Sequence, residues 1–420
     1  MRILFISAYV PSRIRVRPYS FIKALAARGH AITLVCGAGA GDAEALKELR
    51  GLCRRVVAVP TGPREMGWNA LRALAAPMPL QAALNFAPGL LQAVQREARA
   101  GYDVAHIEHL RASALGYGTP LLPTVLDSVD CISLLFERTL RSGPSLRSRT
   151  LALLDLARTR RYEADYTRRY DRVLVTSPED AWALELLAET HPAATRPAEQ
   201  AIHQLKTQNS KLKTQQRNLQ SQIAVIPNGV DLDYFRPPAQ PREQATLVFT
   251  GKMSYHANTA AALMLAREIM PLVWAERPAT RLTIAGSAPP AEVQALAADA
   301  RVQVTGYVPD LRPYLAQATI AVAPLRYGVG IQNKVLEAMA MGTPVVAAQQ
   351  VARALRASDG AELRFAEQPE EYARAILDLL DAPEQRERLS LAGRAYVEQR
   401  HDWQHLATDL EQVYHEAISR

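Results

Sequence analysis

Short apolar runs alternate with helical segments throughout both halves of this chain. Runs of strand length occur at 2–8, 31–36, 56–60, 103–108, 124–129 and 172–177, and again at 245–251, 281–286, 302–308, 320–325 and 344–348. Helical segments at 20–29 and at about 257 to 276 lie between them. This alternation is typical of parallel sheets with helices on both faces. Because 420 residues exceed one ordinary core, we predict an α/β protein of two doubly wound, Rossmann-like domains facing across a cleft.

The segment IAVIPNGVDLDYF (223–235) marks the expected domain boundary, because Pro-Asn-Gly interrupts the chain directly after a strand. We therefore expect a first domain at 1–225 and a second at 226–402. A last helix, from about 403 to 418 and led by Trp403, has enough apolar positions to pack back on the first domain. Residues 403–420 are accordingly predicted as a separate C-terminal segment.

A polar repeat interrupts the first domain. LKTQNSK and LKTQQRN are near-copies, and Leu205, Leu212 and Leu219 recur every seven residues. The leucines could form a short coiled-coil seam, but the other seam positions are mostly polar, so two interpretations stay open. The segment of about 195–222 is either a surface insertion or a helix that binds a partner.

Cysteine content and hydropathy indicate where the chain functions. Its three cysteines, an odd number without metal-ligand spacing, favour a reducing compartment and argue against a zinc site. No apolar run approaches the roughly 18 residues of a membrane span. The opening MRILFISAYV has too short an apolar run for a signal peptide and fits a first buried strand. We expect a cytoplasmic protein.

The net charge of +7 is unevenly distributed. Residues 1–198 hold 26 Lys and Arg against 18 Asp and Glu, whereas residues 224–420 hold 19 against 23. Much of the basic excess lies in 138–172. One interpretation is a solvated helix face, and the other is a surface for anionic lipid or for an acceptor that carries phosphate. No recognition motif accompanies the charge, so we expect no nucleic-acid partner.

The stretch GIQNKVLEAMAMGTPVV (330–346) lies between two strand-like runs and indicates a ligand at the strand-to-helix turn. A helix that begins near Gln332 offers free N–H groups to an anion, ideally a phosphate. Lys334 and Glu337 share one face of it. Lysine can hold phosphate and a carboxylate one turn deeper can accept ribose hydroxyls, which together describe a nucleotide site. The alternative is a salt bridge on a solvated helix.

Two further loops are predicted at the same edge of the sheet. FTGKMSYHAN (249–258) ends a strand in Gly-Lys, so that Lys252 would bring a second positive charge, and GYVPDL (306–311) is suited to packing a base against backbone.

Several linked motifs in the second half resemble glycosyltransferase family 4 of the GT-B fold. These are IPNGVD, the strand-Gly-Lys turn, L-x-I-A-G (282–286), V-x-V-T-G-Y-V-P-D (302–310) and K-V-L-E-A-M-A-M-G-T-P-V-V (334–346). The chain looks closest to sugar transferases of bacterial exopolysaccharide systems, which share G-x-G-I-x-N-K-V-L-E-A-M-A. The first half resembles the family more weakly, in its opening strand, YDVAHIEH and the order of elements.

The resemblance implies a retaining, metal-independent transfer of a hexose-type sugar from a nucleoside-diphosphate donor to a saccharide or lipid-linked acceptor. Glu337 would bind the donor ribose, and Lys334 and Lys252 would face the diphosphate. Asn258 stands at the family's second basic position. Further donor contacts would come from Gly251, Val308, Gly330, Ile331, Gln332 and Asn333.

This sequence departs from the family at two places. Val329 stands where a glutamate usually binds the transferred sugar, and SRIRVRPY (12–19) replaces a glycine-rich turn. In that turn Arg13, Arg15 and Arg17 either contact phosphate or acceptor or belong to a solvated loop.

Two strand ends of the first half supply further candidates. Glu108 aligns with a polar family residue that meets sugar and acceptor, and Asp127 ends the next strand. Each of the two is either catalytic or a helix cap.

Two groups resemble metal ligands without the full pattern. Asp231 and Asp233 spell D-x-D within a turn, and His106, Glu108 and His109 lack a fourth ligand. We predict no metal and no cofactor other than the donor substrate.

Two rival functions stay open, a nucleotide-sugar epimerase and a catalytically degenerate scaffold that binds nucleotide sugar or membrane.

Overall fold

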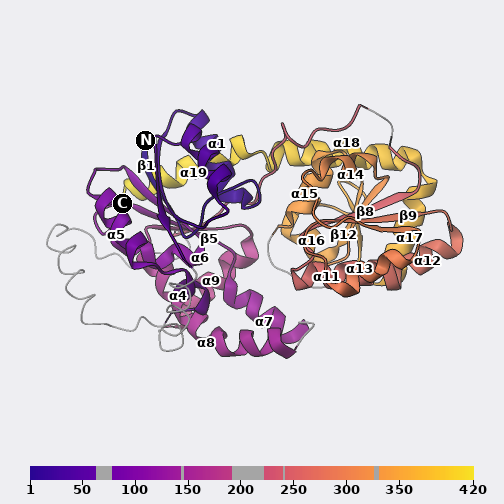
Figure 1. Ribbon diagram of the computed structural model, residues 1–420, viewed down its shortest axis with the longest axis horizontal. Helices are drawn as coiled ribbons and strands as arrows, with labels where there is room; N and C mark the ends of the chain where they lie inside the picture. Colours follow the sequence, from indigo (N-terminus) through magenta and orange to yellow (C-terminus); the bar gives the residue numbers. More distant parts are fainter. Residues whose placement is uncertain (63–77, 143–145, 192–221, 240–241, 326–330) are drawn as a thin grey trace. The chain divides into compact units, whose positions relative to one another are not determined.

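The computed structural model describes residues 1–62, 78–142, 146–191, 222–239, 242–325 and 331–420 (Figure 1). The chain divides into two compact units. Unit 1 comprises Met1–Glu137, Thr150–Ile226 and Asp409–Arg420, and unit 2 comprises Arg138–Arg149 and Pro227–Thr408. The predicted insertion at 195–222 lies outside the described residues except for Gln222, whose carbonyl accepts a hydrogen bond from the Val173 amide.

A seven-stranded parallel sheet forms the centre of unit 1, in the order β3-β2-β1-β4-β5-β6-β7. Its strands fall where the apolar runs predicted them, because both faces of a parallel sheet are covered and nearly every position is apolar. The strands are β1 (Arg2–Ser7), β2 (Ala31–Ala38), β3 (Arg55–Pro60), β4 (Val104–Glu108), β5 (Thr124–Val129), β6 (Arg172–Val175) and β7 (Ile223–Val225).

Helices cover this sheet, and the C-terminal helix is one of them (Figure 1). The helices that lie wholly in unit 1 are α1 (Val16–Ala27), α2 (Ala43–Leu52), α4 (Leu80–Asn85), α5 (Pro88–Ala98), α6 (His109–Ala112) and α9 (Pro178–Thr190). Three more lie partly in it, namely α7 (Ile132–Ser142), α8 (Leu146–Arg169) and α19 (Trp403–Ile418). Within unit 1, Glu411 of α19 binds Arg28, and Tyr414 reaches the strand residue His106.

Unit 2 contains a six-stranded parallel sheet in the order β10-β9-β8-β11-β12-β13. The strands are β8 (Thr246–Thr250), β9 (Arg281–Ala285), β10 (Val302–Val304), β11 (Ile320–Ala323), β12 (Val345–Ala348) and β13 (Arg364–Ala366). The run expected at 302–308 leaves the sheet after Val304, because Gly306 turns the chain with φ +69°. Strand β13, only three residues long, was not predicted. The prediction of two doubly wound, parallel α/β sheets is confirmed.

The helices of unit 2 are α11 (His256–Met264), α12 (Met270–Glu276), α13 (Ala291–Gln294), α14 (Arg312–Gln317), α15 (Asn333–Ala340), α16 (Gln349–Leu355), α17 (Pro369–Asp381) and α18 (Pro383–Arg400). The single helix expected from about 257 to 276 contains a π-helical turn at Leu265–Ile269. Pro271 lies two residues beyond this turn, and since proline has no N–H and crowds the preceding turn, the widened turn has a physical cause.

The predicted boundary segment packs tightly within unit 2. A Cβ on Gly229 would lie 2.7 Å from the Trp403 ring, so only glycine fits there. The Val230 amide donates to the His401 carbonyl, and His401 Nδ1 lies 2.7 Å from the Asn228 carbonyl oxygen. Trp403 therefore packs against the Pro-Asn-Gly turn, while residues 409–420 of the same helix belong to unit 1.

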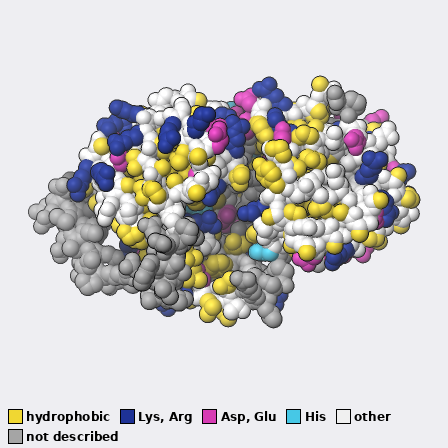
Figure 2. Space-filling view, viewed as in Figure 1, with side chains coloured by type: hydrophobic (Ala, Val, Ile, Leu, Met, Phe, Trp, Pro, Cys, Tyr) yellow, Lys and Arg dark blue, Asp and Glu magenta, His cyan; other side chains and the backbone are white. Residues whose placement is uncertain are grey.

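No helix among the described residues is long and apolar enough to span a membrane. Figure 2 shows many Lys and Arg side chains on the visible face of unit 1, interleaved with hydrophobic ones.

Candidate active site

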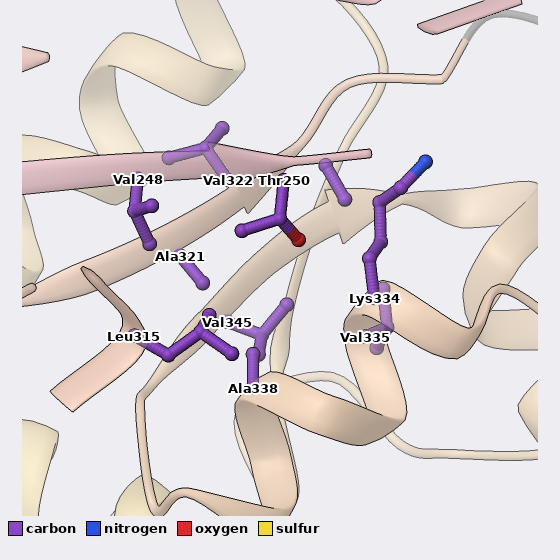
Figure 3. Close-up of a pocket in the computed structure, with 10 residues that line it drawn as sticks. Val248, Thr250, Leu315, Ala321, Val322, Lys334, Val335, Ala338 and Val345 are labelled. Carbon is purple, nitrogen blue, oxygen red and sulfur yellow. The ribbon is translucent and has the colours of Figure 1, made fainter. Parts of the chain in front are cut away.

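The predicted donor residues of unit 2 gather at the carboxyl ends of β8 and β11. Lys334 projects from the first turn of α15 past the strand ends, and its Nζ lies 2.6 Å from Asn258 Oδ1 and 5.2 Å from the centre of the Phe249 ring (Figure 3). Strand and helix side chains line the pocket drawn there, and among these described lining residues Lys334 alone is charged. The helix thus brings a positive charge to the edge where ligands bind in parallel α/β sheets.

Asn258 joins three parts of this edge. It is buried in α11, its Nδ2 donates to the Lys252 carbonyl at 2.9 Å, and its Oδ1 accepts from Lys334. From the family resemblance, we interpret Asn258 as the loss of a second basic residue. In the structure it holds the remaining lysine in place.

Glycine is required where these groups meet. Gly251 has φ +155°, and a Cβ on it would lie 2.8 Å from Asn258 Nδ2 and 3.4 Å from Lys334 Cε. A Cβ on Gly286, after β9, would lie 1.8 Å from the Gly251 carbonyl oxygen. A side chain on Gly251 would displace Asn258 and Lys334, and a side chain on Gly286 would push the ends of β8 and β9 apart.

Lys334 and Glu337 do not form the salt bridge that was the alternative interpretation, since within the described chain Lys334 is bonded to Asn258. Burial lowers the pKa of Lys334 to about 8, an effect that Glu337 opposes. Burial raises the pKa of Glu337 to about 7, an effect that Lys334 opposes. Both side chains keep part of their surface exposed, so both are accessible to a ligand.

The other predicted donor residues lie around this pair. Gln332 is the N-cap of α15, Asn333 Oδ1 accepts from Asn228 Nδ2 at 3.3 Å, and Ile331 is buried. Lys252 is exposed and Val308 half-buried. Gly330, together with Val329, lies outside the described residues.

At the matching edge of unit 1 the three predicted arginines have separate environments. Arg13 pairs with Glu48 at 2.7 Å, and Arg17 is buried and pairs with Asp127, also at 2.7 Å. Arg15 is exposed, with its guanidinium 4.4 Å over the Tyr9 ring. Of the three, Arg15 is the one that has no carboxylate partner among the described residues.

Glu108 and Asp127 are direct neighbours on β4 and β5 and are almost fully buried. The Tyr9 hydroxyl lies 3.4 Å from Glu108 Oε1. Burial raises the pKa of Glu108 to about 7, against the effect of Arg17, and burial also raises the pKa of Asp127, again opposed by Arg17. Because Asp127 is buried and paired with Arg17, we interpret Glu108 and Asp127 as residues that hold neighbouring side chains in position.

Within the described residues, one group has the composition of a metal site, His106 with Glu108 and Asp127, whose ligand atoms lie within 4.8 Å of one another. The sequence suggested His109 as the third member of this group, and the structure has Asp127 in its place. The Arg17 guanidinium, bound to Asp127, already supplies a positive charge there, so the group fits a cation poorly. Asp231 and Asp233 serve their turn, where Asp231 Oδ1 accepts from the Tyr234 amide and Asp233 pairs with Arg236.

Three features of this edge were missed from sequence. Arg111 lies exposed just after β4, and His109 and Val129, at the carboxyl ends of β4 and β5, have φ of +68° and +69°. Left-handed backbone is costly for such residues and clusters at functional sites. The position of Arg111 directly after a strand was visible in the sequence, whereas the strained backbone has no sequence signal.

Two family descriptions match the chain and together span most of it. "Glycosyl transferase 4-like domain" matches residues 14–195, and "Glycosyl transferases group 1" matches residues 244–382. The chain belongs to the group 1 glycosyltransferases. The first match stops at 195, where the predicted insertion begins.

Curated relatives of this group 1 glycosyltransferase match about half of it. A "Phosphatidyl-myo-inositol mannosyltransferase" of Mycobacterium tuberculosis is 31% identical over 48% of this chain and 56% of its own length. A "D-inositol 3-phosphate glycosyltransferase 2" of Catenulispora acidiphila is 30% identical over 47% of this chain and 51% of its own. The chain thus spans about half the length of the curated relatives it matches.

Solved structures share the fold of the group 1 glycosyltransferase over its full length. Sucrose-phosphate synthase from Thermosynechococcus elongatus superposes with a TM-score of 0.65 at 18% identity, covering 100% of both chains. Anabaena Alr3699/HepE in complex with UDP-glucose superposes with a TM-score of 0.62 at 15% identity, covering 98% of both chains. At these identities the likeness establishes the fold.

Proposed function

We propose that this protein transfers a hexose-type sugar from a nucleoside-diphosphate donor to a hydroxyl of a saccharide or lipid-linked acceptor. The observation that carries the proposal is the Lys334 ammonium, held 2.6 Å from Asn258 at the carboxyl ends of β8 and β11, with Glu337 one turn deeper in α15. Family membership and relatives named as a mannosyltransferase and a glycosyltransferase support it. The complex of Alr3699/HepE with UDP-glucose supports a nucleoside-diphosphate sugar as donor.

The chemistry follows from where charge develops. As the glycosidic bond to the donor breaks, negative charge grows on the leaving diphosphate. Lys334 and the free N–H groups at the start of α15 would stabilise that charge, because preorganised donors in a partly dry site act strongly on it. Glu337 would accept the ribose hydroxyls. We further propose retention of anomeric configuration and a reaction without metal, since Lys334 and Lys252 supply positive charge at the diphosphate position.

The basic first unit supports an acceptor site there, and its charge also supports peripheral contact with an anionic membrane surface. We further propose, from the resemblance to exopolysaccharide sugar transferases, a role in cell-surface polysaccharide synthesis at the inner face of the plasma membrane.

The decisive experiment is a thermal-shift screen against common nucleotide sugars, followed by product analysis with the best donor. A donor should raise the melting temperature in proportion to RT ln(1 + [L]/Kd). Transfer to an added saccharide acceptor, undiminished by EDTA, supports the proposal. Conversion of the donor without acceptor would identify an epimerase instead. Tight binding with no turnover would identify a scaffold, and activity restored to EDTA-treated enzyme only by Mg²⁺ or Mn²⁺ would refute the metal-independent mechanism.

A further inference from the structure

Two exposed arginines lie at the carboxyl edge of the unit 1 sheet, and the Arg15 guanidinium donates to the Val10 carbonyl at 3.0 Å. Arg15 is the N-cap residue of α1, which follows β1, and Arg111 belongs to α6, which follows β4. Strands β1 and β4 are neighbours, with Ser7 paired to Glu108 at their ends. Both arginine side chains are exposed, and neither has a carboxylate partner in the described part of the chain. Exposed guanidinium groups that have no carboxylate partner, at the edge of a sheet where ligands bind, indicate a binding site for an anion.

Tyr9 lies near both arginines. The Arg15 guanidinium lies 4.4 Å over the Tyr9 ring, and the Tyr9 hydroxyl lies 3.4 Å from Glu108 Oε1. Burial and Glu108 raise the pKa of Tyr9, and both Arg111 and Arg15 act in the opposite direction. Both guanidinium groups therefore lie within electrostatic reach of one hydroxyl.

The carboxylates of this edge compensate the arginine charge only in part. Asp127 is paired with Arg17. Burial raises the pKa of Glu108 to about 7, and burial together with Asp180 raises the pKa of Asp130 to about 7. Near neutral pH these two acids carry only part of their negative charge.

His109 adds a neutral donor beside Arg111. Its Nδ1 lies 3.3 Å from the Arg111 amide and accepts its hydrogen, so in the neutral ring the proton is on Nε2. Burial lowers the pKa of His109 to about 3, which keeps the ring neutral. The backbone of His109 is held at φ +68°, the kind of strain that persists where function requires it.

We propose that Arg15 and Arg111, assisted by His109, bind a phosphoryl or diphosphoryl group carried by the acceptor. Guanidinium groups recognise phosphate oxygens in pairs, and a neutral imidazole N–H can donate a further hydrogen bond. The assignment rests on the proposed function, because it adds a substrate class to the same reaction. The donor diphosphate has its own group, Lys334 of α15.

The test measures binding of inorganic pyrophosphate by calorimetry to a Lys252→Ala/Lys334→Ala protein, in which both lysines of the proposed donor diphosphate site are removed. We expect binding that weakens about tenfold or more in a further Arg15→Gln/Arg111→Gln variant, as for lost charged hydrogen bonds. The matched control is Arg50→Gln, an exposed arginine of α2, which should leave the affinity unchanged. An Arg15→Lys/Arg111→Lys variant should retain part of the affinity. Absent binding, or equal affinity in all variants, overturns the proposal.

A second arm separates the acceptor from the donor. In Arg15→Gln/Arg111→Gln protein with Lys252 and Lys334 intact, the thermal shift produced by the nucleotide sugar should be that of the unaltered protein. A donor affinity that falls tenfold would assign the arginines to the donor diphosphate and overturn the acceptor assignment. If no nucleotide sugar binds the unaltered protein, the proposed function fails, while the pyrophosphate measurement still decides whether the anion site exists.

Discussion

Lys334 and Asn258 are 76 residues apart in the chain and are joined by a hydrogen bond of 2.6 Å from Nζ to Oδ1. The second hydrogen-bonding group of the amide is also used, since Nδ2 donates to the Lys252 carbonyl. The lysine is therefore oriented before any donor arrives. A group held in position by its surroundings needs no reorganisation when charge develops on the substrate.

Substitutions at the two charged residues of α15 should separate binding from turnover. Lys334→Ala should reduce turnover more than donor affinity, because charge on the leaving diphosphate is greatest in the transition state. Glu337→Gln should weaken donor binding by about 1.5–3 kcal/mol, as for a hydrogen bond to a charged group. Steady-state kinetics and donor titrations measure both. Unaltered kinetics in the two variants would remove the donor site from α15.

Asn258→Ala should reduce turnover about tenfold without loss of the fold, because it frees Lys334 from a hydrogen bond of about 1–2 kcal/mol. Lys334→Ala/Asn258→Ala should then be no slower than Lys334→Ala alone, since Asn258 acts through the lysine. Additive losses in this double-mutant cycle would show that Asn258 contacts the donor directly.

Donor affinity should depend on pH with a maximum between about 7 and 8. Charged Lys334 strengthens binding, and burial lowers its pKa to about 8, so affinity falls as the pH rises through that value. Ionised Glu337 also strengthens binding, and burial raises its pKa to about 7, so affinity falls as the pH drops below that value. Donor titrations from pH 5.5 to about 9.5 test this. Glu337→Gln should remove the acid limb alone, and a flat profile would contradict both assignments.

Glu411 should make the docking of α19 sensitive to acid. Its carboxylate accepts from Arg28 Nε and Nη2 at 2.7 and 2.6 Å, and this hydrogen bonding lowers its pKa to about 2, with a further contribution from His30. Because the folded-state pKa lies below the unfolded one, the stabilisation is complete above about pH 5 and is lost as the pH falls toward 2.

Glu411→Gln should therefore lower the free energy of unfolding by about 1 kcal/mol at pH 7 and by progressively less in acid. Urea unfolding at several pH values measures this difference. Asp233→Asn, which breaks an exposed pair with Arg236, is the control and should have little effect. Equal destabilisation at pH 7 and pH 3 would refute the ion-pair account.

Replacing residues 195–220 by a short Gly/Ser linker should leave the fold and donor turnover nearly unchanged. The flanking elements, α9 ending at Thr190 and β7 beginning at Ile223, belong to the same unit, and loop closure costs change slowly with length. Light scattering checks the oligomeric state, which should fall if the leucine repeat pairs chains. An insoluble or inactive protein would show that the segment packs against the catalytic core.

The sequence by itself determined the two α/β sheets, most strand positions and the family. These are local properties, because apolar runs of strand length and the Gly-Thr-Pro stop after α15 act over a few residues. The same holds for α15, where the spacing of Lys334 and Glu337 left a nucleotide site and a salt bridge open and the family resemblance favoured the nucleotide site.

Only the tertiary structure decided which charges are available at each edge. Arg13, Arg15 and Arg17 are equivalent in the sequence, yet Glu48 pairs with the first and Asp127 with the third. These partners are 35 and 110 residues away. Whether a charged side chain is neutralised depends on which distant strand or helix is folded against it, and no local pattern contains that information.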